Sequence, residues 1–265
     1  MNAAQIDCPI SRTPMDFAFE ATILGRLKVQ YYSCAVCGLL QTEAPYWLEE
    51  AYQTPIALGD TGLMARNIDN SRFLTTFLAQ TYPNTAKFLD LAGGYGILTR
   101  LLRDRGFECF TTDPYCPNLF ASAFEPPTGF KADALFAFEV LEHIHHPYEF
   151  IEQQFTKFDC RTLVFSTLTF PAAPPPRDWW YYAFDTGQHI TFYQRRSLEL
   201  LAERLRCHYH QVNPGLHVIS DAAFSRAGRL VLKNKWARLL LSFHSRMKMR
   251  GKSLTWPDHQ AQTRQ

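Results

Sequence analysis

The chain has 265 residues, of which 46% are hydrophobic and 14% are aromatic, as is typical of a folded globular protein rather than a disordered one. Its formal net charge of +2 gives no general attraction to polyanions, so charge alone implies no nucleic-acid partner. No apolar run approaches the ~18 residues that would span a bilayer, and no signal-peptide pattern is present, so we expect a cytoplasmic location without a transmembrane segment.

Residues 1–45 are predicted to form a small module built around cysteines. In the expected location the seven cysteines of the chain should be thiols or metal ligands rather than disulfides. Cys34 and Cys37 form an intact C-x-x-C pair, whereas the earlier pair consists of Cys8 and Ser11. The two pairs are about as far apart as the two knuckles of a zinc ribbon. The alternative is a metal-free β-hairpin module held by apolar residues: Phe17, Ile23, Val29, Tyr31 and Tyr32.

Residues 46–84 are predicted to form a helical cap or linker before the main domain. Two groups of apolar residues recur at i, i+1, i+4 and i+5, which places each group on one face of a helix. The groups are Trp47, Leu48, Ala51 and Tyr52, and then Phe73, Leu74, Phe77 and Leu78.

A buried strand that breaks into a glycine-rich turn is the central motif of the chain. Residues 87–90 are predicted to be this strand, and a helix follows the turn, with Gly106 as its C-terminal stop. Glycines at a strand-to-helix turn let the backbone approach a ligand and leave the helix N–H groups pointing at it. The turn contains Ala92, Gly93, Gly94 and Gly96.

Two carboxylates beside this turn indicate which ligand it suits. Asp90 ends the strand, where it would repel a pyrophosphate but bind an ammonium group. Asp113 follows a second predicted strand, residues 108–112, where a carboxylate can accept both ribose hydroxyls. No Gly-Lys-Ser/Thr follows the turn, which excludes a P-loop. The ligand that fits is a nucleoside carrying an amino acid and no phosphate, S-adenosylmethionine.

The next strands are predicted at residues 132–138 and 161–167. Phe138 and Glu139 lie where the first of them ends, the edge at which ligands collect in open α/β sheets. Residues 114–129 leave little room for a helix and another full strand, so no residue is assigned to the adenine. The aromatic cluster at residues 179–184 is expected either to stack on a sugar or planar acceptor or to cover the sheet edge as core.

A helix at residues 196–205 and further strands complete the predicted core, which ends at residue 232. The strands are expected at residues 208–213, 216–220 and 229–232. Residues 233–265 form a basic helix and tail whose cations are Lys233, Lys235, Arg238, Arg246, Lys248, Arg250, Lys252 and Arg264. We expect its apolar stripe to dock on the core, with adhesion to an anionic membrane or RNA as the alternative. The stripe consists of Trp236, Leu239, Leu240, Phe243 and Met247.

Three of these segments together resemble the class I S-adenosylmethionine-dependent methyltransferases. The glycine motif of that family usually reads acid, apolar, Gly, any, Gly, any, Gly, and residues 90–96 match it except that Ala92 holds the first glycine place. Residues 138–143, Phe-Glu-Val-Leu-Glu-His, are similar to the segment after the fourth strand of these enzymes, and residues 187–193 to a later one. The resemblance implies a Rossmann-like seven-stranded α/β sheet with helices on both faces, formed here by residues 85–232.

More narrowly, the chain looks like a subgroup with an N-terminal cysteine module that is often found beside glycosyltransferases. Members of this subgroup carry a cysteine where this chain has Ser11, and a serine hydroxyl is a poor zinc ligand. The resemblance leaves two outcomes open. Either a zinc ion keeps three thiolates, Cys8, Cys34 and Cys37, and takes a fourth ligand from elsewhere, or the module has lost its metal and kept its fold.

The resemblance implies methyl transfer from S-adenosylmethionine to a small-molecule acceptor. By association with the subgroup, the acceptor is expected to be a hydroxyl of a sugar or surface-polysaccharide precursor. A hydroxyl must lose its proton, and His189 is the expected catalytic base, with His143 as the second candidate. The residues expected to bind the cofactor are Asp90, Ala92, Gly93, Gly94, Gly96, Asp113, Phe138 and Glu139.

Two other classes of function stay open. An RNA or protein methyltransferase is suggested by the cysteine module and the basic tail, although a nucleic-acid partner is not expected from the overall charge. A cofactor-binding partner subunit without catalysis is suggested by Ala92, Ser11 and the missing acid for the adenine. The sequence does not indicate the oligomeric state.

Overall fold

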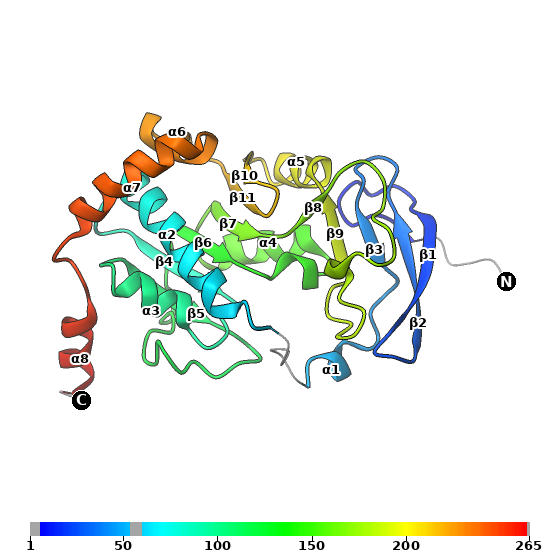
Figure 1. Cartoon of the computed structure of the whole chain (residues 1–265), viewed down its shortest axis with the longest axis horizontal. Coiled ribbons are helices and arrows are strands. Elements are labelled where there is room, and N and C mark those ends of the chain that lie inside the picture. Colours follow the sequence, from blue (N-terminus) through cyan, green and yellow to red (C-terminus); the bar gives the residue numbers. More distant parts are fainter. Residues whose placement is uncertain (1–5, 54–59, 264–265) are drawn as a thin grey trace.

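The computed structural model describes residues 6–53 and 60–263 (Figure 1). Three parts of the predicted elements therefore lie outside the described residues. They are residues 1–5 of the cysteine module, residues 54–59 of the helical cap, and residues 264–265 of the tail, which include Arg264.

The central sheet has six strands in the order β10-β11-β7-β6-β4-β5. Strands β5, β4, β6 and β7 are parallel, and β11 and β10 add an antiparallel hairpin at the β7 side. The strands are β4 (Lys87–Leu91), β5 (Glu108–Thr112), β6 (Ala134–Ala137), β7 (Thr162–Ser166), β10 (His208–Asn213) and β11 (Leu216–Ser220).

Helices cover both faces of this sheet. On one face α2, α3, α6 and α7 share an apolar core with the strands, through side chains such as Phe77, Leu102 and Val231. On the other face α4 and α5 contribute Ile151 and Leu198 to a second core. The helices are α2 (Leu63–Thr81), α3 (Ile97–Arg103), α4 (Pro147–Lys157), α5 (Arg195–Arg204), α6 (Arg226–Lys233) and α7 (Lys235–Met249).

The predicted Rossmann-like α/β architecture is confirmed, but the described part of the chain forms six central strands rather than seven. Between β5 and β6 the chain runs through turns and bends at residues 113–133. Prolines lack the N–H that a central strand donates, and this stretch contains Pro114, Pro117, Pro126 and Pro127. Only a single contact, from the Thr111 N–H to the Phe124 carbonyl (2.9 Å), covers the outer edge of β5 there among the described residues.

The strand predicted at residues 229–232 is wrong, because these residues belong to helix α6. The Ser225 hydroxyl caps that helix by accepting a hydrogen bond from the Gly228 N–H (3.0 Å). Val231 and Leu232 are then buried against α2 and the sheet. A short apolar run does not distinguish a buried strand from a buried helix, and here the cap decides for the helix.

The cysteine module and the main domain share a second, five-stranded sheet in the order β1-β2-β3-β9-β8. Its strands are β1 (Asp16–Ile23), β2 (Leu27–Ser33), β3 (Leu40–Thr42), β8 (Thr169–Phe170) and β9 (Thr191–Gln194). Strand β3 pairs with β9 through Leu40 and Phe192, and the Thr42 N–H donates to the Ile190 carbonyl (3.0 Å). The predicted domain boundary at residue 45 therefore crosses a continuous sheet.

The residues predicted to hold the hairpin do so with one exception. Ile23, Val29, Tyr31 and Tyr32 are buried, whereas Phe17 is 59% exposed. The short helix α1 (Leu48–Ala51) follows the sheet, and the Trp47 indole N–H donates to the Gly187 carbonyl (2.8 Å). The predicted cap segment is thus tied to the chain just before His189.

The C-terminal tail docks on the core, but not through the predicted stripe. Helix α7 packs on α2, with a hydrogen bond between Gln80 and Ser245 (3.0 Å). Helix α8 (Thr255–Thr263) places the buried Asp258 carboxylate against Arg103 (2.5 Å) and Arg100 (3.0 Å). The stripe faces outward, with its side chains 53% to 75% exposed: Trp236, Leu239, Leu240, Phe243 and Met247. Among the described residues, no helix has the length and apolar character needed to cross a bilayer.

Candidate active site

The carboxyl ends of four parallel strands bring most of the predicted site residues to one edge of the central sheet. Leu91 at the end of β4 lies opposite Thr112 of β5, and Ala137 at the end of β6 lies opposite Phe165 of β7. The glycine turn, Asp113 and Glu139 follow directly after these strands. In open α/β sheets this edge is where ligands bind.

The glycine turn leaves no room for larger side chains on its inner side. A Cβ added to Gly93 would collide with Thr111 Oγ1 and lie 2.6 Å from Asp90 Oδ2. A Cβ on Gly96, whose φ is +82°, would collide with the Asn118 side chain. Ala92 also adopts a positive φ, 50°, which costs a residue with a Cβ some strain and which glycine adopts readily. The turn is therefore packed against the protein at Gly93 and Gly96, whereas a Cβ on Gly94 would meet nothing within 4 Å, which leaves space for a ligand there.

Asp113 ties this turn to the loop that follows β5. Its Oδ2 accepts a hydrogen bond from the Gly94 N–H (2.9 Å), and its Oδ1 accepts from the N–H groups of Tyr115 (2.7 Å) and Cys116 (2.8 Å). These three N–H donors fix the carboxylate at the sheet edge and use both lone pairs of Oδ1, so Oδ2 keeps the capacity for a further donor. This position suits the hydroxyls of a ribose.

Asp90 carries a buried oxygen that is ready for a cationic partner. The residue is 2% exposed, and its Oδ2 has no hydrogen-bond partner among the described residues. Burial raises the pKa of Asp90 to about 8, and the nearby Asp113 carboxylate adds to the shift. A buried carboxylate oxygen under a close-packed glycine turn, with a second carboxylate one strand away, fits a cofactor that has an ammonium group and a ribose.

The raised pKa predicts that affinity for S-adenosylmethionine increases with pH between about 6 and 8. Asp90 is mainly protonated below its pKa, and the cofactor's ammonium favours the carboxylate form, so binding must release a proton there. Linkage then gives up to about tenfold tighter binding per pH unit in this window. Titration calorimetry in buffers of different ionisation enthalpy measures both the affinity for the cofactor and the number of protons released on binding. Asp90→Asn should remove the proton release, and a flat affinity profile for the unaltered protein would contradict the assignment.

His143 and His189 lie together at the same edge, with ring centres 4.9 Å apart. The Nδ1–H of His143 donates to the Gln188 carbonyl (3.0 Å), and the Nδ1–H of His189 donates to the Tyr181 carbonyl (2.6 Å). Because a carbonyl only accepts, both rings carry their proton on Nδ1 and present a lone pair on Nε2. Burial lowers the pKa of His143 to about 3 and also lowers that of His189, so both rings are neutral near pH 7.

Glu142 completes this cluster and was not among the predicted site residues. It lies in the 3₁₀ turn Leu141–His143 and is fully buried, and its Oε1 accepts a hydrogen bond from the Tyr181 hydroxyl (2.8 Å). Its Oε2 has no partner among the described residues. Burial raises the pKa of Glu142 to about 8, and the neighbouring Glu139 carboxylate raises it further. One donor atom from each of Glu142, His143 and His189 lies within 4.8 Å of the others.

Glu139 and Phe138 occupy the end of β6 in different ways. Glu139 has a positive φ of 56°, a strained conformation of the kind found at functional sites. The Ser166 hydroxyl donates to its Oε1 (2.7 Å), and Arg66 lies 3.7 Å from its Oε2. Phe138 is partly buried against the core on the α2 side of the sheet. The structure therefore orients Glu139 at the edge, and Phe138 is largely a packing residue.

An aromatic pair that was not predicted stands next to the histidines. Tyr52 from the cap segment stacks on Tyr115 from the loop after β5 (4.8 Å between ring centres) and lies 6.2 Å from His143. In the aromatic cluster at residues 179–184, Tyr181 and Tyr182 are buried and Trp180 is 74% exposed. Most of that cluster is therefore core, and the pair at Tyr52 and Tyr115 is the aromatic surface near the site.

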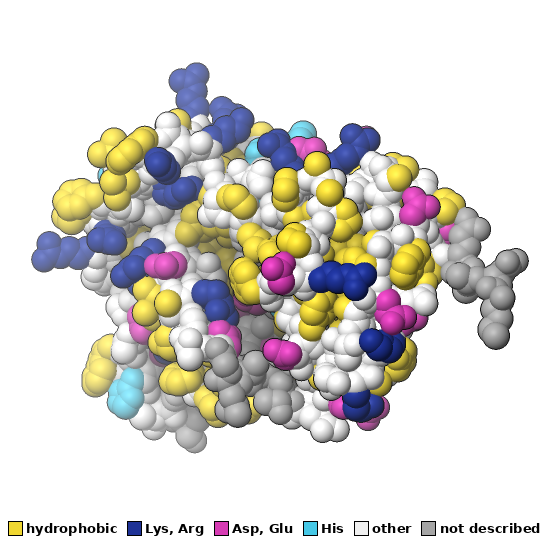
Figure 2. Space-filling model, turned by 45° about the vertical axis from the view of Figure 1, so that its right-hand side comes forward, with side chains coloured by type: hydrophobic (Ala, Val, Ile, Leu, Met, Phe, Trp, Pro, Cys, Tyr) yellow, Lys and Arg dark blue, Asp and Glu magenta, His cyan; other side chains and the backbone are white. Residues whose placement is uncertain are grey.

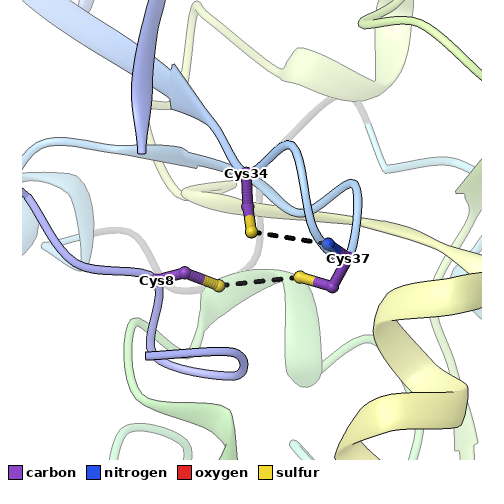
Figure 3. Close-up of side chains that lie close together, drawn as sticks. All are labelled: Cys8, Cys34 and Cys37. Carbon is purple, nitrogen blue, oxygen red and sulfur yellow. Dashed lines mark hydrogen bonds between the residues drawn. The ribbon is translucent and has the colours of Figure 1, made fainter. Parts of the chain in front are cut away.

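The three predicted cysteine ligands lie close together and are buried (Figure 3). Cys8 Sγ lies 3.6 Å from Cys37 Sγ, and the Cys37 N–H donates to Cys34 Sγ (3.4 Å). A tetrahedral zinc ion with Zn–S bonds of ~2.3 Å holds its sulfurs about 3.8 Å apart. The Ser11 hydroxyl lies 3.2 Å from Cys34 Sγ, at the fourth corner of the group.

The electrostatics of the cysteine group suit a cation. The hydrogen bond from Cys37 lowers the pKa of Cys8 to about 5, while the same contact and burial raise the pKa of Cys37. The group is also fixed to helix α5, because the Ser197 hydroxyl donates to the Cys37 carbonyl (3.0 Å) and the Arg196 side chain donates to the Val36 carbonyl (2.6 Å). Helix α5 directly follows β9, the strand after His189.

The sequence of this chain matches one known protein family. Residues 64–212, more than half of the chain, match the family model of a methyltransferase domain. No curated protein matches the sequence.

Several solved structures have a fold similar to part of this chain. The protein TnmH is 15% identical, with 66% of this chain and 61% of that chain covered and a TM-score of 0.42. An O-methyltransferase family protein from Burkholderia thailandensis is 15% identical, with 60% and 55% covered and a TM-score of 0.45. Human N-acetylserotonin methyltransferase, solved with S-adenosylmethionine, is 13% identical, with 68% and 60% covered and a TM-score of 0.46. The match thus spans well under two thirds of the length of each.

The family match covers the glycine turn, Asp113, the 3₁₀ turn with Glu142 and His143, and His189. The chain belongs to the methyltransferase domain family and has an α/β fold.

Proposed function

We propose that the protein transfers a methyl group from S-adenosylmethionine to a hydroxyl of a small-molecule acceptor, with a sugar or surface-polysaccharide precursor as the substrate class. The observation that carries the reaction type is the half-buried, neutral pair of His143 and His189 beside the cofactor edge. The substrate class is supported by the resemblance to the subgroup with an N-terminal cysteine module. The stacked rings of Tyr52 and Tyr115 offer a flat apolar wall for a sugar ring.

Asp113 would hold the ribose of the cofactor and Asp90 its amino group, over the backbone of Gly93 and Gly94. The bound cofactor supplies a methyl group on a cationic sulfur, which is a good leaving group. Most of the barrier is then lowered by holding the acceptor in line, an effect worth ~7–11 kcal/mol in favourable cases. We place the acceptor between the glycine turn and the histidine pair, because the Nε2 lone pairs lie there.

The acceptor hydroxyl must lose one proton as its oxygen forms the new bond to the methyl carbon and the carbon–sulfur bond breaks. His189 would accept that proton at Nε2. Its Nδ1–H is held by the Tyr181 carbonyl (2.6 Å), which orients the ring and stabilises the imidazolium that forms. His143 would support the ring from the side.

We keep the predicted cytoplasmic location and the predicted division into domains as part of this proposal.

The test is incorporation of labelled methyl from S-adenosylmethionine into a panel of acceptors. Nucleotide sugars, free sugars, phenols, a peptide mixture and RNA cover the classes of acceptor considered. Label in a sugar hydroxyl supports the proposal. Label in RNA or peptide alone replaces the acceptor class, and cofactor binding without label in any acceptor indicates a non-catalytic subunit.

We also propose that the cysteine group binds one Zn²⁺ through Cys8, Cys34 and Cys37, with the Ser11 hydroxyl or a water as the fourth ligand. Ser11→Cys should then raise zinc affinity, because it supplies the fourth thiolate of a closed site. Cys34→Ser should lower the melting temperature and the zinc content together. Elemental analysis of the full chain measures the zinc content, and thermal unfolding measures the melting temperature. Zinc content near zero in the unaltered protein, with no gain in Ser11→Cys, would contradict zinc binding.

A further inference from the structure

Three side chains at the acceptor edge, one buried and two half-buried, point to a ligand that the histidine pair alone does not explain. Glu142, His143 and His189 bring one donor atom each to within 4.8 Å of one another. Glu142 is fully buried and its Oε2 has no partner among the described residues, although its Oε1 is fixed by the Tyr181 hydroxyl. A buried carboxylate oxygen without a hydrogen-bond partner destabilises the folded protein unless a ligand binds to it.

The two imidazole rings are held as metal ligands usually are. Each donates its Nδ1–H to a backbone carbonyl, His143 to Gln188 and His189 to Tyr181, and this fixes both the tautomer and the ring orientation. The Nε2 lone pairs remain for a ligand. In metal sites the second ring nitrogen of a ligating histidine almost always makes such a hydrogen bond.

The backbone under the three side chains is rigid. The Ile190 N–H donates to the Glu142 carbonyl (2.9 Å), and the buried Tyr193 hydroxyl donates to the Leu141 carbonyl (2.9 Å). Glu142 and His143 from the 3₁₀ turn are thereby fixed relative to His189. A preorganised set of three donors is what a metal site needs.

We infer that Glu142, His143 and His189 bind a divalent metal ion of the first transition row, such as Mn²⁺ or Fe²⁺. Two imidazoles and one carboxylate that leave open positions are typical of such ions. The inference rests on the proposed function and deepens it. Contact with the cation at an open position would lower the pKa of an acceptor hydroxyl, which would release its proton to solvent water as its oxygen bonds to the methyl carbon. His189 then acts on the acceptor as a metal ligand rather than as the base.

Mn²⁺ is the probe that separates this site from the cysteines, because thiolates prefer softer metals. Titration of the full chain followed by electron paramagnetic resonance should show one bound Mn²⁺ per chain. Glu142→Gln keeps an acceptor for the Tyr181 hydroxyl but removes the charge, and we expect it and His189→Asn each to weaken binding by more than about tenfold. Cys34→Ser is the matched control and should leave Mn²⁺ binding unchanged. Calorimetric binding of S-adenosylmethionine checks that each variant is folded.

Binding and activity together separate this inference from the proposed function. Mn²⁺ binding that depends on Glu142 and His189 supports the metal site whether or not methyl transfer is detected. Absence of Mn²⁺ binding, or binding unaffected by both substitutions, overturns it. If methyl transfer then persists with a chelator present and depends on His189, the histidine acts as the base, and the proposed function stands without the metal.

A second and independent observation concerns the exposed face of α7. Its apolar side chains lie on one helix face, and hydrophobic and cationic side chains gather side by side at the end of the molecule that carries α6 and α7 (Figure 2). Monomeric proteins rarely expose such a stripe without a partner. Exposed cations on the same two helices are Arg226, Arg229, Lys233, Lys235, Arg246, Lys248 and Arg250.

A basic groove runs beside the stripe, between α2 and α7. It has a volume of about 790 Å³, and its only acidic lining residue is Asp104. Its cationic lining residues are Arg72, Arg105, Lys235, Arg238, Arg246 and Arg250. An apolar stripe next to a cationic surface is the pattern of a helix that lies in the interface of an anionic bilayer. The geometry points to a membrane surface that contains anionic lipid as the occupant of the α7 face.

Co-sedimentation with phosphatidylcholine vesicles, with and without phosphatidylserine, tests this docking surface. We expect binding only when phosphatidylserine is present, and we expect the double substitution Leu239→Ser with Leu240→Ser to weaken it by more than about tenfold. Trp256→Ser, at an exposed position on α8, is the control and should bind as the unaltered chain does. No binding, equal binding to both vesicles, or a soluble dimer that the double substitution dissociates would overturn the membrane assignment.

Discussion

Replacement of His189 by alanine is expected to lower the rate of methyl transfer by about 10²–10⁴-fold, the usual contribution of a group that handles the acceptor proton. The Nδ1–H of His189 is fixed by the Tyr181 carbonyl, which leaves the Nε2 lone pair for the acceptor proton. Affinity for S-adenosylmethionine should stay nearly unchanged, because the cofactor contacts are assigned to other residues. Single-turnover rates at saturating cofactor, with calorimetric dissociation constants, measure the two quantities separately.

His146→Ala is the matched control for this prediction. His146 belongs to the same loop region as His143 but is exposed and stacks only on His145. Its replacement should change neither rate nor cofactor affinity. If His189→Ala weakened cofactor binding as much as it lowered the rate, the histidine would belong to the cofactor site, and its assigned role on the acceptor would be wrong.

The central strands were predictable because their signals are local. Residues 108–112, 208–213 and 216–220 form strands with the predicted limits, and the strand predicted at residues 87–90 extends one residue further, since each is a short run bounded by turn residues or charges. Helix α6 was not predictable from residues 229–232. These four residues show no clear period, and the Ser225 hydroxyl that caps the helix lies before them in the sequence.

The cofactor half of the candidate site was also readable from the sequence. Asp90 and Asp113 each end a strand, and parallel strands deliver their carboxyl ends to one edge. The acceptor half depends on contacts between distant segments. Glu142 meets Tyr181 across the fold, and Tyr52 meets Tyr115 from another loop. No local pattern in the sequence indicates either contact, and Glu142 could be interpreted only as a residue of a helix start.

The outward-facing stripe of α7 shows the same limit. Its spacing in the sequence correctly indicates one helix face, but periodicity does not tell which partner that face meets. In the structure Ser245 and Met249 take the inward positions against α2. The helix therefore docks through its less apolar side, and the more apolar side is left for another surface.

Asp113→Ala should have the reverse effect of His189→Ala. One charge-assisted hydrogen bond to the ribose would be lost, worth about 1.5–3 kcal/mol, so affinity for S-adenosylmethionine should fall by at least about tenfold. The substitution also releases the N–H groups of Gly94, Tyr115 and Cys116, which loosens the turn that the cofactor covers. The single-turnover rate at saturating cofactor should change little, because Asp113 has no assigned contact with the acceptor.

Calorimetry on the full chain separates this expectation from a general loss of folding. Asp159→Ala is the control, since that carboxylate forms only a surface ion pair with Lys131 and should leave affinity unchanged. The cofactor affinity of Asp113→Asn should lie between those of Asp113→Ala and Asp159→Ala, because an amide oxygen still accepts hydrogen bonds but carries no charge. If Asp113→Ala bound S-adenosylmethionine as tightly as the unaltered chain, the ribose would lie elsewhere, and the glycine turn would have to hold a different part of the cofactor.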